Sequence, residues 1–289
     1  MASIPTSGST AFGLGELPGT DLRQAADVVI SESPLPHLPQ LPARGIGFDA
    51  IGRTAALVPI PIDRGPRGWR VSSQHRTVRD HMPRDLDELE GYWGKVDTLK
   101  VQVVGPWTLA AEVEMKNGHR MITDPGALRD ITEALAEAVN EHLQDVARRF
   151  SARTVLQLDE PRLGQVMRGE LRGATRYHDI PAVPEPLERL EPFGDFLLHT
   201  DALVETDWLT VDVAAATQTQ QKDALARLIE GGTRLAVAPV EPSQLWRFFD
   251  DVQIDPASVN IDVWARPATT LVGAASNYKQ AREMSEGLL

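Results

Sequence analysis

Two adjacent carboxylates at the end of an apolar stretch are the residues of this chain best suited to chemistry. Asp159 and Glu160 follow the apolar run 154–158, and Pro161 prevents the strand expected there from continuing. An unpaired charge is very costly to bury, so both carboxylates are expected at the rim of a sheet rather than in its core. In α/β folds, the rim at the carboxyl ends of the strands is where ligands bind.

A histidine and two aspartates end the next apolar stretches. His199 follows 196–198, Asp201 comes two residues later, and Asp212 follows 209–211. Residues i and i+2 of a strand point to the same side. One imidazole and two carboxylates could therefore hold a divalent metal ion together.

Each of these residues also fits a structural role. His199 could be a histidine that is hydrogen-bonded at a strand end, and Asp201 and Asp212 could cap turns or helices. Asp159 and Glu160 could cap the helix that follows them. Residue type and position alone leave both interpretations open.

Eight predicted strands alternate with helices along the chain. The strands are assigned to residues 10–17, 58–62 or 69–72, 99–104, 154–158, 196–198, 209–211, 235–240 and 259–263. A long helix is predicted over 124–150, where apolar residues recur every three or four positions after a cap residue and a proline. Such alternation implies a parallel sheet with helices outside. Eight units in 289 residues predict one α/β domain over residues 1–289, a (β/α)8 TIM barrel.

The barrel would gather residues that are far apart in the sequence. Its strand ends would place Glu16 and Gly105 at the same mouth as Asp159 and His199. The segment 34–42 holds four prolines and is predicted to be an extended connection, because proline cannot donate a hydrogen bond within a central strand.

The composition restricts the class of protein and its partners. The chain contains no cysteine, so it has no disulfide, no thiolate metal ligand and no cysteine nucleophile. No apolar run approaches the ~20 residues that cross a bilayer, and the first residues lack the features of a signal peptide, so a cytoplasmic protein is expected. A net charge of -12 disfavours nucleic acid and anionic membranes as partners.

Arginines are concentrated in one part of this acidic chain. Between residues 44 and 84, eight arginines stand against three aspartates. They could receive the anionic tail of a substrate, or they could be solvated charges on a loop-rich surface.

Several segments resemble one known family. Residues 157–161, Gln-Leu-Asp-Glu-Pro, resemble the strand-end motif of the cobalamin-independent methionine synthases, whose catalytic half is a (β/α)8 barrel. Further resemblances follow in the family's order, at 13–20, 104–109, 198–201 and 211–212. The resemblance spans nearly the whole chain.

The resemblance implies an activity and a set of site residues. In this family a zinc ion activates homocysteine as a thiolate, which takes a methyl group from 5-methyltetrahydrofolate carrying a glutamate tail. The chain would then be a methyltransferase with small-molecule substrates, an amino acid and a folate, and with zinc or another divalent metal as cofactor. The implied roles are metal binding for His199, Asp201 and Asp212, catalysis for His199, Asp159 and Glu160, and substrate binding for Gly15, Glu16, Gly105 and Asp159.

The chain departs from the family at the metal ligands and in the amino-acid pocket. Asp201 stands in place of the first cysteine, Asp212 in place of a glutamate, and Glu16 in place of a serine, while the last predicted strand has no cysteine. Carboxylates make a harder metal site than thiolates do. Two alternatives stay open. One is a metal-free decarboxylase-like barrel acting on an anionic substrate, as in the related uroporphyrinogen decarboxylases. The other is a non-catalytic binding protein that keeps the pocket.

Overall fold

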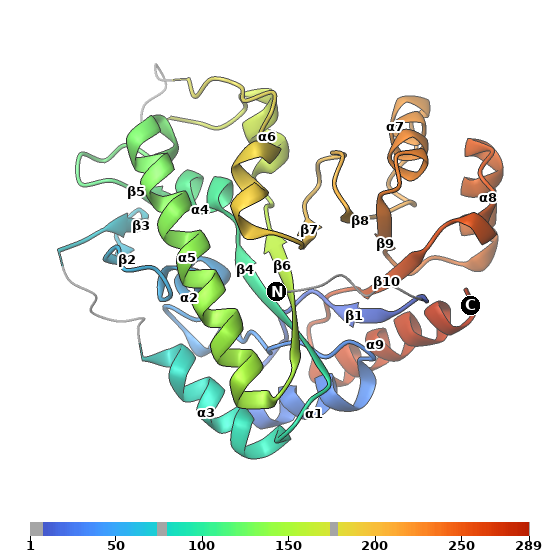
Figure 1. Cartoon of the computed structure of the whole chain (residues 1–289), viewed down its shortest axis with the longest axis horizontal. Coiled ribbons are helices and arrows are strands. Elements are labelled where there is room, and N and C mark those ends of the chain that lie inside the picture. The colour runs from blue at the N-terminus through green and yellow to red at the C-terminus, as the bar shows by residue number, and fades with distance from the viewer. Residues whose placement is uncertain (1–7, 74–79, 174–178, 289) are drawn as a thin grey trace.

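The computed structural model describes residues 8–73, 80–173 and 179–288, which form a mixed α/β fold (Figure 1). Its largest sheet consists of β1 (Ala11–Gly13), β4 (Thr98–Val104), β6 (Arg153–Asp159), β7 (Leu197–His199), β8 (Trp208–Val211), β9 (Arg234–Val237) and β10 (Ile261–Ala265). A second sheet contains β2 (Ile62–Gly65), β3 (Gly68–Val71) and β5 (Val113–Glu114). The helices are α1 (Leu22–Glu32), α2 (Ala50–Ala55), α3 (His81–Trp93), α4 (Pro106–Glu112), α5 (Pro125–Phe150), α6 (Leu163–Arg168), α7 (Thr219–Glu230), α8 (Pro242–Val252) and α9 (Leu271–Glu286).

The large sheet is parallel and curled, with the strand order β1-β10-β9-β8-β7-β6-β4. Helices cover its outer side: α5 lies along β6, and α9 lies along β1 and β10 (Figure 1). The prediction of a parallel sheet with outer helices is confirmed. None of the described helices is long and apolar enough to cross a membrane.

The long helix α5 follows the predicted pattern closely. Asp124 accepts a hydrogen bond from the backbone N–H of Ala127 and caps the helix, and a proline occupies its first turn. The predicted apolar face is buried, with Ile131 and Val146 fully enclosed. This face packs against β6.

The predicted second strand does not belong to the large sheet. Residues 69–71 form part of β3, and only Ile62 of the segment 58–62 is in a strand, β2. These two strands pair antiparallel in the separate sheet. Within the described residues the large sheet therefore has seven strands, and it is not the closed eight-stranded barrel that was predicted.

The proline-rich segment lies between the two edge strands, β1 and β4. It makes isolated bridges on both sides, at Gln40 with Glu16 and at His37 with Lys100. Three of its backbone N–H groups donate to carbonyl oxygens of the neighbouring chain, and none of these donors is a proline. The bonds run from Leu35 to Ala11 (3.1 Å), from Leu38 to Lys100 (3.1 Å) and from Gln40 to Gly15 (2.9 Å). The missing N–H groups of proline are therefore tolerated, because the residues between the prolines supply the donors. The segment is extended, as predicted, but it is more than a connection.

Alternation along β6 decides which side chains face the inside of the curl. Val155 belongs to a small buried cluster that also contains Phe12 and Trp208. Gln157 and Asp159 follow at i+2 and i+4, so they project from the same face, nearer to the carboxyl end. The register pairs Lys100 of β4 with Val155, which puts the Lys100 side chain on this face too.

Candidate functional site

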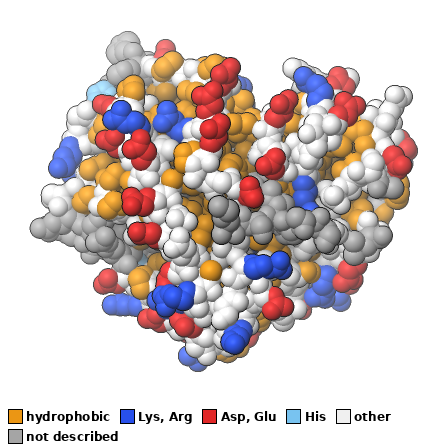
Figure 2. Space-filling model, viewed as in Figure 1, with side chains coloured by type: hydrophobic (Ala, Val, Ile, Leu, Met, Phe, Trp, Pro, Cys, Tyr) orange, Lys and Arg blue, Asp and Glu red, His pale blue; other side chains and the backbone are white. Residues whose placement is uncertain are grey.

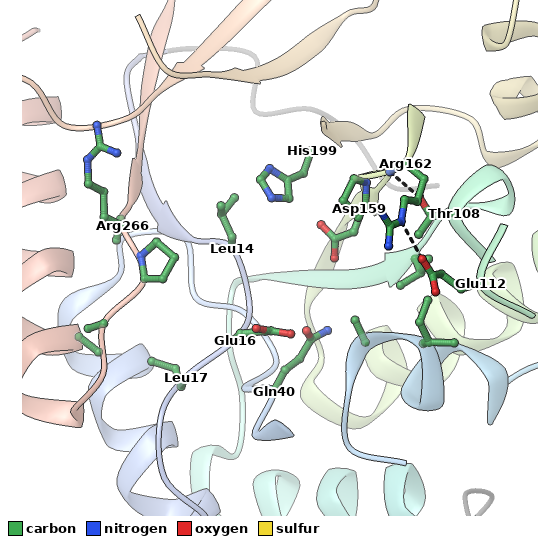
Figure 3. Close-up of a pocket in the computed structure, with 18 of the residues that line it drawn as sticks. Leu14, Glu16, Leu17, Gln40, Thr108, Glu112, Asp159, Arg162, His199 and Arg266 are labelled. Atoms are coloured by element: carbon green, nitrogen blue, oxygen red, sulfur yellow. Dashed lines mark hydrogen bonds and ion pairs between the residues drawn. The ribbon is translucent and has the colours of Figure 1, made fainter. Parts of the chain in front are cut away.

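A cavity of about 510 Å³ opens at the carboxyl ends of the strands (Figure 3). Its polar lining includes Glu16, Gln40, Asp159, Arg162, His199 and Arg266. The carboxylates of Glu16 and Asp159 and the imidazole of His199 point into the same space (Figure 3). In the view of Figure 2 the surface is hollowed between the parts that carry α6 and α7, and acidic side chains border the hollow.

The structure separates the predicted site residues into three groups. Three of them, Glu16, Asp159 and His199, line the large cavity. Asp201 and Asp212 line an adjoining cavity of about 230 Å³, which His199 also borders. The remaining three, Gly15, Gly105 and Glu160, line neither cavity.

Asp159 is the polar residue at the carboxyl end of β6. Its Oδ1 accepts a hydrogen bond of 2.6 Å from Nε2 of Gln157. Burial raises the pKa of the Asp159 carboxyl, the bond from Gln157 and the charge of Lys100 oppose that rise, and the negative charge of Glu16 adds to it. An additional positive charge in the cavity would favour the ionised carboxylate.

Glu16 brings a second carboxylate to the same cavity from the chain that follows β1. Burial raises the pKa of its carboxyl, and the nearby Asp49 raises it further. Within the described residues, no hydrogen bond or ion pair reaches this carboxylate. Glu16 and Asp159 thus form an acidic part of the cavity wall to which no Lys, Arg or His side chain of the described residues is bonded.

His199 lies at the wall between the two cavities. Its Nδ1 is 2.9 Å from the hydroxyl oxygen of Thr210, which holds the ring in place. Burial lowers the pKa of His199 to about 4, and the positive charge of Lys100 contributes to this shift. The imidazole is therefore neutral near pH 7.

The three predicted metal ligands border the same small cavity but are not arranged as a metal site. Over residues 8–73, 80–173 and 179–288, no three His, Asp or Glu side chains are grouped so that they could hold a metal ion. Asp212 instead forms an ion pair of 3.0 Å with Arg266 and accepts a bond from the N–H of Ala214, as a turn-capping aspartate does. Asp201 lies against Gly164 of α6. The described residues therefore do not fit a zinc site formed by His199, Asp201 and Asp212.

Glu160 is fully buried and holds the start of α4. Its carboxylate accepts bonds from the backbone N–H of Trp107 (2.9 Å) and of Thr108 (2.7 Å), and from the Thr108 hydroxyl (2.6 Å). Burial raises the pKa of Glu160 to about 7, although these three donors oppose the shift. The capping role considered for the carboxylate pair thus fits Glu160, with the difference that it caps the preceding helix α4.

Gly105 is explained by the same carboxylate. A Cβ on Gly105 would lie 2.2 Å from Oε1 of Glu160, so only glycine fits beside this buried side chain. Gly15 contributes its carbonyl oxygen, which accepts a bond from Gln40, to the contact with the proline-rich segment.

Replacing Gly105 with alanine is expected to destabilise the fold by about 1–3 kcal/mol, because the new methyl group overpacks the site of Glu160. Urea denaturation followed by circular dichroism would measure the loss. The matched control is Gly91→Ala in α3, where an added Cβ meets no atom within 4 Å. Equal stability of the two variants would contradict this explanation of Gly105.

The arginine-rich segment supplies no described guanidinium group to the cavity. Arg44 and Arg53 both pair with Asp85, at 2.7 Å and 3.3 Å, and none of the described arginines between 44 and 84 lines the cavity. Arg76 and Arg79 lie outside the described residues. The guanidinium groups at the cavity come from Arg162 and Arg266 instead, which the sequence interpretation did not single out.

Two further residues beside the site were assigned no role from the sequence. Lys100 and Gln157 are fully buried polar residues within β4 and β6. The signal for both was a polar side chain inside an apolar strand, because such a group must find a partner when it is buried. Comparison with models of known protein families and with curated proteins gives no match to this chain.

Proposed function

We propose that the cavity binds a small amino-acid-like substrate through its ammonium group, in a TIM-like α/β protein related to the methionine synthases. The observation that carries this proposal is the acidic pair. Glu16 and Asp159 line one cavity, and no Lys, Arg or His side chain of the described residues bonds to either carboxylate. A ligand ammonium group would supply the missing positive charge.

The rest of the cavity suits a small zwitterion. A volume of about 510 Å³ lies within the range of small-molecule sites. Arg162, which pairs with Glu112 at 2.7 Å, and Arg266 offer guanidinium groups that can receive a ligand carboxylate or an anionic tail. Acidic and basic groups on the same cavity lining favour a ligand that carries both charges.

For the reaction we propose methyl transfer from a folate-type donor to the thiol of a homocysteine-like substrate, as the sequence resemblance implies. Since the described residues do not form a ligand set for zinc, the roles proposed for this chain are to bind the ammonium group and to orient the substrate.

Isothermal titration calorimetry tests the binding step. L-Methionine and L-homocysteine are expected to bind, whereas 4-(methylthio)butanoic acid, which is methionine without its amino group, should bind at least about tenfold more weakly because a charge-assisted contact is lost. Equal affinity for methionine and the amine-free acid would refute the ammonium site.

A turnover assay tests the reaction separately. The protein is incubated with L-homocysteine and triglutamyl 5-methyltetrahydrofolate, with zinc supplied, and methionine is measured by mass spectrometry. Formation of methionine supports methyl transfer. Ligand binding without methionine would refute this reaction and favour a binding protein.

A further inference from the structure

A buried lysine lies behind the acidic wall of the cavity. Lys100 of β4 is completely enclosed, and its ammonium group lies 5.4 Å from the centre of the Phe12 ring. Its Nζ donates a hydrogen bond to Oε1 of Gln157. An ammonium group can only donate, so it requires the amide oxygen of Gln157 to face it.

The other end of the same amide faces the cavity. Nε2 of Gln157 donates to the carbonyl oxygen of Leu14 at 2.8 Å and to Oδ1 of Asp159 at 2.6 Å. Both N–H groups of the amide are therefore hydrogen-bonded. The acceptors beside its nitrogen and the donor beside its oxygen require the same orientation of the amide. The orientation of the amide is determined from both sides.

This chain of contacts leaves one oxygen of Asp159 for a ligand. Oδ1 is occupied by Gln157, whereas no described residue donates a hydrogen bond to Oδ2. The amide directs its positive end at the carboxylate, and the ammonium group of Lys100 lies behind it. Both effects favour the ionised form of Asp159.

We propose that Lys100 and Gln157 are positioning residues, which orient the Asp159 carboxylate and keep it ionised for the ammonium group of the substrate. The proposal rests on the proposed function, because it assigns a task to residues that do not line the cavity themselves. Burying a lysine whose described hydrogen-bond partner is a neutral amide costs free energy, and the proposed role gives a reason for that lysine.

Other charged groups also act on Asp159. Glu16 raises the pKa of its carboxyl, and Lys100 lowers it. Burial in turn lowers the pKa of Lys100, and the charge of Asp159 opposes that shift, so the effect of Lys100 on Asp159 is strongest at low pH. Glu160 adjoins Asp159 in the sequence and is directed at α4. His199 is the register partner of Asp159 on β7 and is neutral near pH 7. Arg162 lines the same cavity and is paired with Glu112. Among these groups, Lys100 is the cation linked to Asp159 through a shared hydrogen-bond partner.

The test is the pH dependence of L-methionine affinity, measured by calorimetry from pH 5.5 to 9. Wild-type affinity is expected to fall as pH decreases, because Asp159 takes up a proton. In Lys100→Met the midpoint of this fall should move to higher pH by about one unit, since a nearby positive charge no longer favours the carboxylate. Affinity should fall by up to about tenfold at pH values below both midpoints, and by less as the pH rises through them. Gln157→Leu should shift the midpoint in the same direction.

Stability separates this role from a purely structural one. Replacing a buried charge with an apolar side chain of similar volume is often neutral or stabilising, so Lys100→Met should keep or raise the urea midpoint while it weakens binding. The matched control for Gln157→Leu is Gln102→Leu. Gln102 is a buried glutamine of β4 that bonds to His37 and the Leu38 carbonyl, and its replacement should leave the pH midpoint unchanged.

The outcomes distinguish the two proposals. If Lys100→Met and Gln157→Leu bind L-methionine as tightly as wild type does, with unchanged pH midpoints, the positioning role is overturned and the proposed function stands. If wild type binds no L-methionine, the proposed function fails. The positioning role is then tested in the free protein by 13C NMR titration of the Asp159 carboxyl, assigned by its loss in Asp159→Asn. An unchanged Asp159 pKa in Gln157→Leu and Lys100→Met would overturn it there too.

Discussion

Replacing Asp159 with asparagine is expected to weaken L-methionine binding by about 100-fold or more at pH 8. Removing one partner of a desolvated, hydrogen-bonded charge pair costs roughly 2–5 kcal/mol, and every 1.4 kcal/mol is tenfold in affinity. Burial raises the pKa of Asp159 above the usual range of an aspartate. As the pH is lowered, wild-type Asp159 is therefore protonated well above pH 4. The difference between wild type and variant should then be largest at high pH and shrink as the pH falls.

Calorimetry at several pH values measures this difference. The control is Asp207→Asn, the same chemical change at an exposed residue just before β8, at the opposite end of the sheet from the cavity. It should bind L-methionine as wild type does. Wild-type affinity in Asp159→Asn would remove Asp159 from the binding site, and a pH-independent loss would show that ionisation of Asp159 is not what the ligand requires.

Replacing Glu160 with glutamine is expected to destabilise the fold by about 3 kcal/mol or more. The carboxylate accepts three hydrogen bonds at the start of α4, whereas the glutamine amide has one oxygen and would turn N–H groups toward N–H and O–H donors. A buried donor left without a partner costs about 1–3 kcal/mol, more when a charged group was involved. Urea denaturation at pH 8, above the pKa of about 7 to which burial raises Glu160, would measure the loss.

The matched control is Glu137→Gln on the exposed side of α5, which should change stability by less than about 0.5 kcal/mol. Residual L-methionine binding should persist in folded Glu160→Gln, because Glu160 does not line the cavity. A fully stable Glu160→Gln variant without binding would reverse the assignment and make Glu160 a site residue.

Asp159 and Glu160 show which features of the site follow from the local sequence and which depend on the tertiary structure. The sequence was sufficient to place both carboxylates at a strand end, because an apolar run that stops at two charges and a proline has few alternatives. It could not assign them different tasks. Neighbouring residues of a strand project to opposite sides, and which side faces a cavity depends on what packs there. The structure directs Asp159 into the cavity and Glu160 under α4.

The proline-rich segment illustrates the limit of local rules. Its composition predicts extended backbone, and residues 36–40 are extended. That the segment lies between β1 and β4 depends on N–H groups of the residues between the prolines meeting carbonyl oxygens of distant chain. The sequence predicts the second strand further along the chain, in 58–62 or 69–72, where the chain instead enters a separate three-stranded sheet.

The sequence by itself determined the alternation of strands and helices, the long amphipathic helix α5 and the strand ends where polar residues gather. These follow from the spacing of apolar residues, from caps and from proline, all of which act within a few residues. Only the tertiary structure decided that Lys100 reaches Gln157, that Asp212 pairs with Arg266 instead of joining His199, and that Glu16 and Asp159 share a cavity. These contacts join residues 54 to 143 positions apart or depend on strand register. The apolar pattern of a strand limits its register, but which distant strand it pairs with depends on the faces that are buried together in the folded sheet.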